Sequence, residues 1–291
     1  MFKISQCPVC SGAEFKGFLT CKDYTVSQKE FEIVQCKSCE FVFTDPRPEN
    51  KDLGQYYKSD AYISHSDSSA GIVNKLYKLA RSFTLKSKYA LVKPYAMNKG
   101  LLDVGCGTGA FLNFCAHKDL IVDGVEPDED ARKFVQNNHG IFVHEEDQLK
   151  KWEPQKFSAI TMWHVLEHVP DLNERIQELK NLLDISGRLF VAVPNYTSGD
   201  AKHYGTHWAA YDVPRHLWHF SPKTIRTLFN KHGFVLERTL PMKLDSYYVS
   251  MLSEKYKNGS PRLFSAVLSG LKSNLAAGDD KWSSQIYVFK K

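Results

Sequence analysis

The sequence predicts an α/β protein whose main domain is a doubly wound, mostly parallel sheet, preceded by a small metal-stabilised module. From residue 100 onward, short apolar runs alternate with segments of helical periodicity, which is the order that βαβ units require. Before residue 45, two Cys-x-x-Cys pairs stand apart from any such unit. The 291 residues, 43% of them hydrophobic, are enough for one large core and one or two small modules.

The bulk composition favours a cytoplasmic protein. The net charge of +5 is modest and the basic residues are dispersed, which favours a solvated basic surface over a nucleic-acid-binding stripe. No apolar run approaches the roughly 20 residues of a membrane span, and the N-terminus lacks the apolar stretch of a secretion signal. We therefore expect no transmembrane segment, while peripheral membrane contact stays open.

The first 45 residues contain two pairs of cysteines, Cys7 with Cys10 and Cys36 with Cys39. Each pair fits a tight knuckle, and four thiolates from two knuckles complete a tetrahedral zinc shell. A redox pair is the alternative for a lone Cys-x-x-Cys, but no strand-helix-strand pattern surrounds these. We predict a four-cysteine zinc ribbon over residues 1–45, in which Zn²⁺ supplies much of the folding free energy.

Residues 46–98 are predicted to form a linker and an amphipathic helical segment. The linker holds Tyr62 and the polar loop SHSDSSAG. From Ile72 to Phe83, apolar residues recur at helical spacing, with basic residues such as Lys75 facing outward. Packing of this helix on the next domain is favoured over a position on a membrane surface.

Residues 99–291 are predicted to form the main domain, with insertions at 196–220 and 242–280. The predicted strands are 101–106, 120–127, 141–147, 157–163, 187–195, 234–240 and 284–290. The predicted helices are 108–117, 128–140, 171–187 and 221–233, the last three beginning at a capping Asp or Ser. Right-handed crossovers between these units place a ligand crevice at the carboxyl ends of the strands.

A glycine-rich turn joins the first predicted strand to its helix. The run DVGCGTG places Asp103 before Gly105, Gly107 and Gly109, and a second acidic residue, Glu126, ends the next strand. Glycines there permit positive φ and a close approach of a ligand to the backbone. Such a turn alone suits several nucleoside cofactors. The G-x-G-x-G spacing and the two acidic residues narrow the choice among these cofactors.

On these residues the sequence resembles the class I S-adenosylmethionine-dependent methyltransferases, over roughly residues 95–291. DVGCGTG is typical of that family, and VLEHVPD resembles its subgroup of quinone and small-molecule methyltransferases. The cysteine array is similar to a zinc-binding module fused to some sugar and natural-product methyltransferases. The resemblance implies a Rossmann-like, seven-stranded methyltransferase sheet with S-adenosyl-L-methionine as its cofactor.

The resemblance also implies which residues meet the cofactor. The glycine turn, with Cys106, would receive the methionine moiety, and Asp103 would lie near its ammonium group. Glu126 would take both ribose hydroxyls, a bidentate task suited to a carboxylate at a strand end. Pro127 would lie against the adenine, and Asp147 would accept from its amino group.

At the end of the fourth predicted strand, Trp163 and His164 would border the cofactor, with core packing an equal alternative for Trp163. His164, Glu167 and His168 also spell H-x-x-E-H, an inverted zinc-peptidase signature. A peptidase is disfavoured because the motif follows a strand and Glu237, a downstream candidate ligand, lies in another strand. The three residues either bind a divalent metal near the acceptor, as the quinone methyltransferases imply, or two of them are structural while His164 faces the pocket, which is favoured.

The insertion 196–220 is expected to lie over the crevice. Methyl transfer is an in-line displacement, so a base is needed only if the acceptor must lose a proton. His216 is the candidate base, with Asp212 fixing its tautomer; the alternative is an Asp–Arg–His network, through Arg215, that pins the loop. The insertion 242–280 is expected to form a lid or an oligomer surface.

The predicted function is S-adenosylmethionine-dependent methylation of a small-molecule acceptor that is saccharide-derived, lipid-linked or ring-containing. An RNA methyltransferase with a zinc-ribbon reader is disfavoured, because the ribbon lacks a basic-aromatic stripe. A non-catalytic cofactor-binding scaffold is disfavoured by the intact glycine turn. The sequence leaves open the acceptor, the methylated atom and the oligomeric state.

Overall fold

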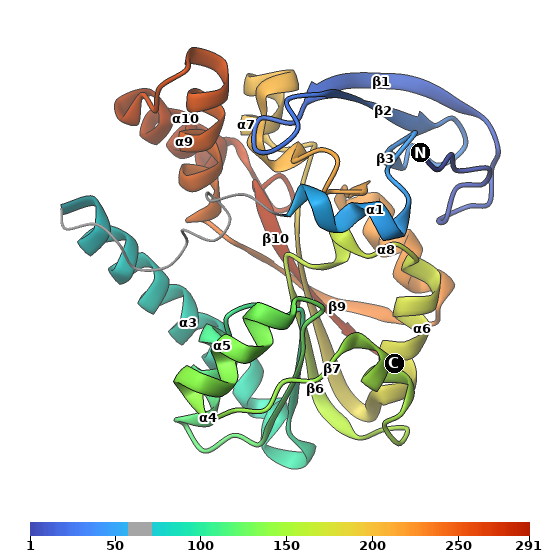
Figure 1. Ribbon diagram of the computed structural model, residues 1–291, viewed down its shortest axis with the longest axis vertical. Helices are drawn as coiled ribbons and strands as arrows, with labels where there is room; N and C mark the ends of the chain where they lie inside the picture. The colour runs from blue at the N-terminus through green and yellow to red at the C-terminus, as the bar shows by residue number, and fades with distance from the viewer. Residues whose placement is uncertain (58–71) are drawn as a thin grey trace.

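The structure is a computed structural model that describes residues 1–57 and 72–291, with side chains described again from Ala80 (Figure 1). Tyr62, the SHSDSSAG loop and the side chains of Ile72 and Lys75, on which part of the linker prediction rested, lie outside the described residues. No helix in the described ranges combines the length and hydropathy needed to cross a bilayer.

A mixed sheet forms the centre of the molecule. Within the described ranges it has six strands in the order β5-β4-β6-β7-β10-β9. They are β4 (Leu101–Val104), β5 (Val122–Val125), β6 (Phe157–Trp163), β7 (Leu183–Pro194), β9 (Val235–Pro241) and β10 (Ser284–Lys290). The strands β4 to β7 are parallel, and β10 runs antiparallel to both β7 and β9. The winding reverses between β4 and β6, so a ligand crevice is expected at the carboxyl ends of these two strands.

Six of the seven predicted strands form, and the third does not. Residues 141–147 make one parallel bridge, between His144 and Val125, and then enter the 3₁₀ helix Glu146–Lys150. Val143 is the one buried residue of this segment, so little apolar burial supports a longer strand at the sheet edge.

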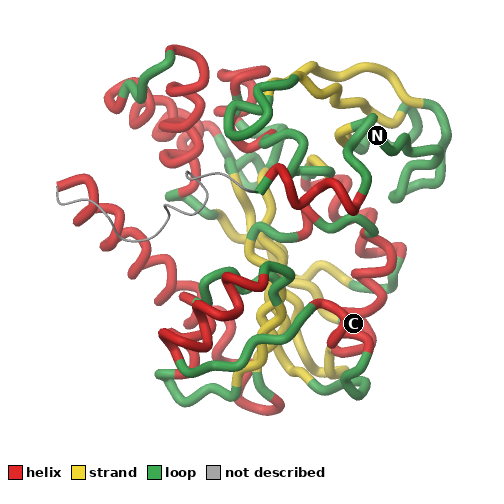
Figure 2. Tube along the Cα trace, viewed as in Figure 1, coloured by secondary structure: helices red, strands yellow, loops and turns green. Residues whose placement is uncertain are grey.

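Helices cover both faces of the sheet (Figures 1 and 2). On one face, α3 (Ile72–Lys99) and α4 (Ala110–Ala116) contribute to a core with Phe190 and Ala192 of β7. On the other, α6 (Leu172–Leu182) and α8 (Pro222–Lys231) pack with Leu189 and Val191. The alternation along β7 is the period-two pattern of a strand buried on both sides. α5 (Glu129–His139) lies beside α4 and packs through Val135.

The predicted amphipathic segment is one continuous helix, α3, whose packing begins later than the sequence indicated. Leu85, Tyr89, Val92 and Ala96 contact the core, whereas Phe83 is 65% exposed. The prediction that Phe83 faces the domain is therefore wrong. The reason is visible in Figure 1, where the N-terminal half of α3 projects beyond the sheet.

The N-terminal strands form a second, antiparallel sheet. Its order is β1 (Phe15–Lys22), β2 (Glu30–Cys36), β3 (Val42–Thr44) and β8 (Trp218–His219), counted over the described part of the chain. Because β8 comes from the insertion 196–220, the ribbon and that insertion share one sheet, with Phe43 opposite Trp218. The predicted boundary near residue 45 stays a prediction.

Short helices complete the chain. α1 (Asn50–Leu53) follows the ribbon, and α7 (Gly199–Tyr204) lies in the insertion 196–220. The insertion 242–280 forms an antiparallel pair of helices, α9 (Asp245–Asn258) and α10 (Leu263–Ala276), which pack on each other and on α7. Figure 1 shows this pair at one corner of the molecule, away from α5 and α6.

Candidate active site

The glycine turn after β4 is tightly bent and closely packed beneath. Gly105, Gly107 and Gly109 all have positive φ, between 55° and 73°. A Cβ atom on Gly105 would lie 2.6 Å from Val165, and one on Gly109 would lie 2.8 Å from Val135, whereas one on Gly107 would meet open space. The turn is therefore closed toward the protein and open at Gly107, as a backbone that receives a ligand must be.

Asp103, at the base of this turn, is buried and accepts a hydrogen bond from the Thr161 hydroxyl at 2.6 Å. Burial raises the pKa of the Asp103 carboxyl to about 7, against the opposing influence of Thr161 and of the Lys88 ammonium group. Lys88, from α3, lies with its Nζ 4.3 Å from the centre of the Trp163 ring. The sequence analysis did not single out Lys88, because only tertiary packing brings α3 to the turn.

Glu126 directly follows β5 and faces the turn. Its Oε2 accepts from the backbone N–H of Gly107 at 2.8 Å, and its Oε1 accepts from that of Asp128 at 3.1 Å. Burial raises the pKa of this carboxyl. The thiol of Cys106 is half-buried, and burial raises its pKa as well, so it is not a nucleophile at neutral pH.

The predicted adenine contacts lie farther along the same edge. Pro127 is exposed, and its carbonyl accepts from Arg132 at 2.7 Å. The carboxylate of Asp147 is on the surface, where it pairs with Lys151 at 2.5 Å. Asp147 sits in the 3₁₀ helix that replaces the third predicted strand. The structure thus gathers Asp103, the glycine turn and Glu126 at one edge of the sheet, and the cofactor-binding roles of these residues, of Pro127 and of Asp147 stay predictions.

Trp163 and His164, at the end of β6, border this site. The Trp163 ring packs edge-on against Phe111 of α4, and its Nε1 is buried without a hydrogen-bond partner among the described residues. His164 has a φ of 58°, which is unusual for a residue other than glycine. Both interpretations of Trp163, core packing and contact with a ligand, are compatible with this position.

Two carboxylates hold His164 in its unusual conformation. Its Nε2 lies 2.9 Å from Asp245 Oδ2, and its Nδ1 lies 3.3 Å from Glu167 Oε1. Burial alone would lower the pKa of His164, but the two carboxylates raise it to about 9. The ring is therefore an imidazolium at neutral pH and poorly suited to accept a proton. Asp245 begins α9, far away in sequence, and no local pattern indicated it.

The group of side chains able to hold a cation differs from the H-x-x-E-H trio. Possible ligand atoms of Glu167, His168 and His216 lie within 4.8 Å of one another, with His216 in the place expected for His164. Glu167 is fully buried, and its Oε1 lies 3.3 Å from His164 Nδ1. His164 is not a member of this group, and its two ring nitrogens face Glu167 and Asp245.

His216 is oriented by a backbone carbonyl and not by Asp212. Its Nδ1 lies 2.8 Å from the carbonyl oxygen of Ala210, which can only accept, so Nδ1 carries a proton. Its Nε2 lies 3.8 Å from Asp212, beyond hydrogen-bonding distance. Asp212 instead accepts two hydrogen bonds from Arg215, at 2.5 and 2.9 Å. The expectation that Asp212 fixes the tautomer is therefore corrected, and Nε2 is the free proton acceptor in the neutral ring.

Arg215 also ties the insertion to the N-terminal half of the chain. Its guanidinium lies 3.4 Å from Asp23 of the ribbon and donates to the carbonyl of Tyr56 at 3.0 Å. Burial would lower the pKa of Arg215, but Asp212 and Asp23 raise it, so its charge is permanent. The ribbon thereby helps to hold the loop that carries His216.

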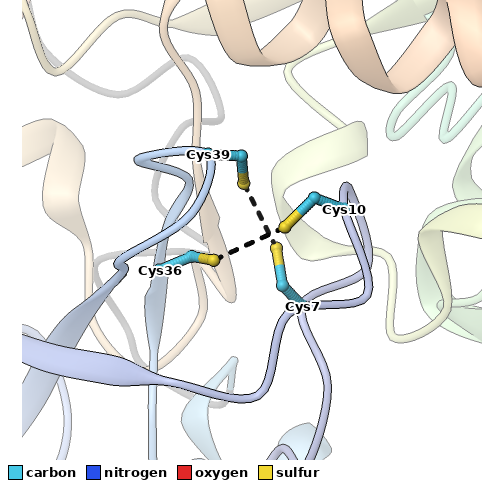
Figure 3. A group of neighbouring side chains, drawn as sticks. All are labelled: Cys7, Cys10, Cys36 and Cys39. Carbon is cyan, nitrogen blue, oxygen red and sulfur yellow. Dashed lines mark hydrogen bonds between the residues drawn. The ribbon is translucent and has the colours of Figure 1, made fainter.

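The four predicted zinc ligands converge at the start of the chain (Figure 3). The sulfur atoms of Cys7 and Cys39 are 3.5 Å apart, as are those of Cys10 and Cys36. Four thiolates about 2.3 Å from one zinc ion would be separated by about 3.8 Å. The arrangement is consistent with a zinc ribbon, and all four residues are free cysteines.

The family follows from comparison with known proteins. A family profile described as a methyltransferase domain matches residues 76–239, which is more than half of the chain. The chain belongs to this methyltransferase family. The resemblance to class I S-adenosylmethionine-dependent methyltransferases, and the Rossmann-like fold, are thereby confirmed.

Curated relatives of the chain include ubiquinone biosynthesis O-methyltransferases. That of Glaesserella parasuis serovar 5 (strain SH0165) is 37% identical over 111 residues, which are 34% of this chain and 47% of that protein. That of Coxiella burnetii (strain RSA 331 / Henzerling II) is 30% identical over 118 residues, 38% of this chain and 50% of that protein. The chain thus spans about half the length of these two relatives.

Solved structures share its fold. Magnesium protoporphyrin IX methyltransferase from Synechocystis PCC 6803 with bound SAH has a TM-score of 0.55 at 15% identity, covering 84% of this chain and all of that one. Haemonchus contortus phosphoethanolamine N-methyltransferase 2 in complex with S-adenosyl-L-methionine has a TM-score of 0.52 at 16% identity, covering 95% and 68%. These likenesses concern the fold alone.

Proposed function

We propose that the methyltransferase transfers a methyl group from S-adenosylmethionine to a small-molecule acceptor that is saccharide-derived, lipid-linked or ring-containing. The observation that carries the proposal is the Glu126 carboxylate, which accepts from the N–H of Gly107 in the turn after β4, next to the point where the sheet reverses its winding. The match of a third of the chain to ubiquinone O-methyltransferases supports a small acceptor.

The residues at the sheet edge suit the polar groups of S-adenosylmethionine. Glu126 has two oxygens for the two ribose hydroxyls, and Gly107 offers a backbone donor once that carboxylate turns to the ribose. Asp103 and Lys88 carry opposite charges beside the turn, which suits the ammonium and carboxylate groups of the methionine moiety. When bound, the cofactor supplies a methyl group activated by its sulfonium, so the protein contributes alignment and exclusion of water.

Asp103 gives this assignment a pH dependence. Its pKa is about 7 in the unliganded protein, so it is largely protonated below that pH and ionised above it. The cofactor ammonium prefers the ionised form, so affinity should rise about tenfold between pH 6 and pH 8 and level off above. Titration calorimetry across this range checks the slope, and Asp103→Asn should give a weaker and flat profile. An equal slope in Asp103→Asn would assign the titration to another group.

His216 is the proposed base for acceptors that must lose a proton. Its Nδ1–H is held by the Ala210 carbonyl, which leaves Nε2 to accept the proton. Glu167, which is buried and pairs with His164 through Oε1, stabilises the imidazolium that forms, because it lies in the same cluster. His164 is already charged because nearby carboxylates raise its pKa, so its role at the crevice is structural and not that of a base.

A labelling experiment tests both the reaction and the base. Extract from cells that lack the protein is incubated with purified enzyme and S-adenosylmethionine bearing a deuterated methyl group, and labelled products are found by mass spectrometry. A labelled small molecule supports the proposal, whereas label confined to digested RNA would favour the RNA methyltransferase. An enzyme that binds the cofactor but labels nothing would favour the non-catalytic scaffold.

His216→Asn should slow this labelling by about a hundredfold, because general-base catalysis contributes at least that much. Asparagine keeps a donor for the Ala210 carbonyl but has no basic atom, so cofactor affinity should not change. His203, exposed on α7, supplies the control His203→Ala, which should label at the wild-type rate. A normal rate for His216→Asn would remove His216 from the chemistry.

A further inference from the structure

Helix α10 buries its small residues and exposes its large apolar ones. Its inner face consists of Ala266, Ser269, Gly270 and Ser273. Its outer side chains include Phe264, 84% exposed, and Leu275, 77% exposed. The set, named here the α10 face, comprises Leu263, Phe264, Val267, Leu268, Leu271 and Leu275. A surface helix of a globular protein normally shows the reverse arrangement.

Specific contacts fix this orientation. Gly270 lies so close to α9 that a Cβ atom there would be 2.8 Å from the Tyr247 ring. The Ser273 hydroxyl donates to the buried carboxylate of Asp200 at 2.7 Å, and the Ser246 hydroxyl donates to the Gly270 carbonyl at 3.3 Å. Rotating α10 to bury its leucines would break these bonds and force a side chain into α9. The outward apolar face is therefore built into the fold.

Basic residues predominate in the segment that contains the α10 face, and the exposed Asp279 and Asp280 directly follow it. Residues 255–278 contain Lys255, Lys257, Arg262 and Lys272 but no Asp or Glu. All four basic residues are exposed. A second copy of the chain docked through this face would bring two such positive segments together, which is unfavourable. A surface that is both apolar and anionic is complementary to it.

We propose that the α10 face binds the surface of an anionic lipid bilayer. Its apolar side chains enter the boundary between headgroups and acyl chains, and the four basic residues meet anionic headgroups. The helix pair also reaches the candidate active site, because Asp245 at the start of α9 pairs with His164. If the proposed function holds, this connection indicates that the acceptor has an apolar tail and is methylated at the membrane surface.

Vesicle binding by the purified full chain tests the proposal. The protein should sediment with vesicles of phosphatidylcholine and phosphatidylglycerol, and much less with phosphatidylcholine alone. Phe264→Ser with Leu271→Ser should lower the partition coefficient about a hundredfold, roughly tenfold for each side chain. Arg262→Gln with Lys272→Gln should lower it about twenty-five-fold, since each basic residue near the surface contributes about fivefold.

Matched controls come from other exposed apolar residues. Ile121 is 73% exposed and Phe142 is 66% exposed, and neither belongs to α10. Ile121→Ser with Phe142→Ser should bind vesicles as the wild type does. Circular dichroism and cofactor titration on every variant distinguish the loss of vesicle binding by a folded protein from unfolding.

Three results would overturn the proposal. The first is a wild-type protein that does not bind anionic vesicles, and the second is α10 variants that bind them normally. The third is a wild-type dimer, measured by light scattering, that becomes a monomer in Phe264→Ser with Leu271→Ser while no form binds vesicles; the α10 face would then be a dimer interface. Cofactor binding that persists in these cases leaves the proposed function standing, whereas vesicle binding without cofactor binding refutes the function alone.

Discussion

Replacing Glu126 with alanine is expected to weaken S-adenosylmethionine binding about a thousandfold without unfolding the protein. The proposed bonds from this carboxylate to two ribose hydroxyls are charge-assisted, and each contributes about 1.5–3 kcal/mol. In the unliganded protein the same carboxylate accepts from Gly107 and Asp128. Both N–H groups lie at an open edge where water can replace it, so stability should fall by only about 1 kcal/mol.

Titration calorimetry measures the affinity, and thermal unfolding measures the stability. Glu126→Gln should show an intermediate loss of affinity, since it keeps one acceptor oxygen but no charge. The control is Glu129→Ala, an exposed position in the first turn of α5 whose carboxylate pairs only with Lys133 among the described residues. Unchanged affinity in Glu126→Ala would show that the cofactor does not bind where the glycine turn indicates.

Local patterns were sufficient to predict most of the main sheet. β10 occupies residues 284–290 as expected, because an apolar run that is buried on both sides needs no distant partner to be recognised. α5 is capped at its start by Asp128, whose side chain accepts from the N–H of Ala131, and at its end by Gly140 in the left-handed region. Helix caps and glycines act on residues within a few positions, so their effect can be predicted from the sequence.

The parts of the site that were not predicted depend on contacts between distant segments. Asp245 meets His164 across 81 residues, and Lys88 reaches Asp103 from a helix that precedes the sheet. The replacement of His164 by His216 in the cation-capable group has the same cause. Neither spacing nor periodicity contains this information, because only the packing of α3, α9 and the insertion 196–220 creates these contacts.

Exchange of Cys36 and Cys39 for serine is expected to remove one zinc ion per chain and unfold the ribbon. Structural zinc in small modules contributes about 10–16 kcal/mol, and serine cannot replace a thiolate ligand. β2 ends at Cys36 and pairs with β3. β3 in turn pairs with β8, which directly follows the loop that carries His216. Unfolding should therefore also loosen that loop and reduce methyl labelling by more than about a hundredfold if His216 is the base.

Glu126 and the glycine turn lie in the other sheet, so cofactor affinity of the double serine variant should change only a few-fold. Metal analysis and calorimetry on the same sample measure the two effects separately. Cys21→Ser is the matched control, because Cys21 is a buried cysteine of β1 outside the four-sulfur cluster, and it should retain the zinc. If the double variant kept its metal, the four sulfur atoms would not be zinc ligands. Loss of metal with undiminished labelling would instead mean that His216 does not need the ribbon.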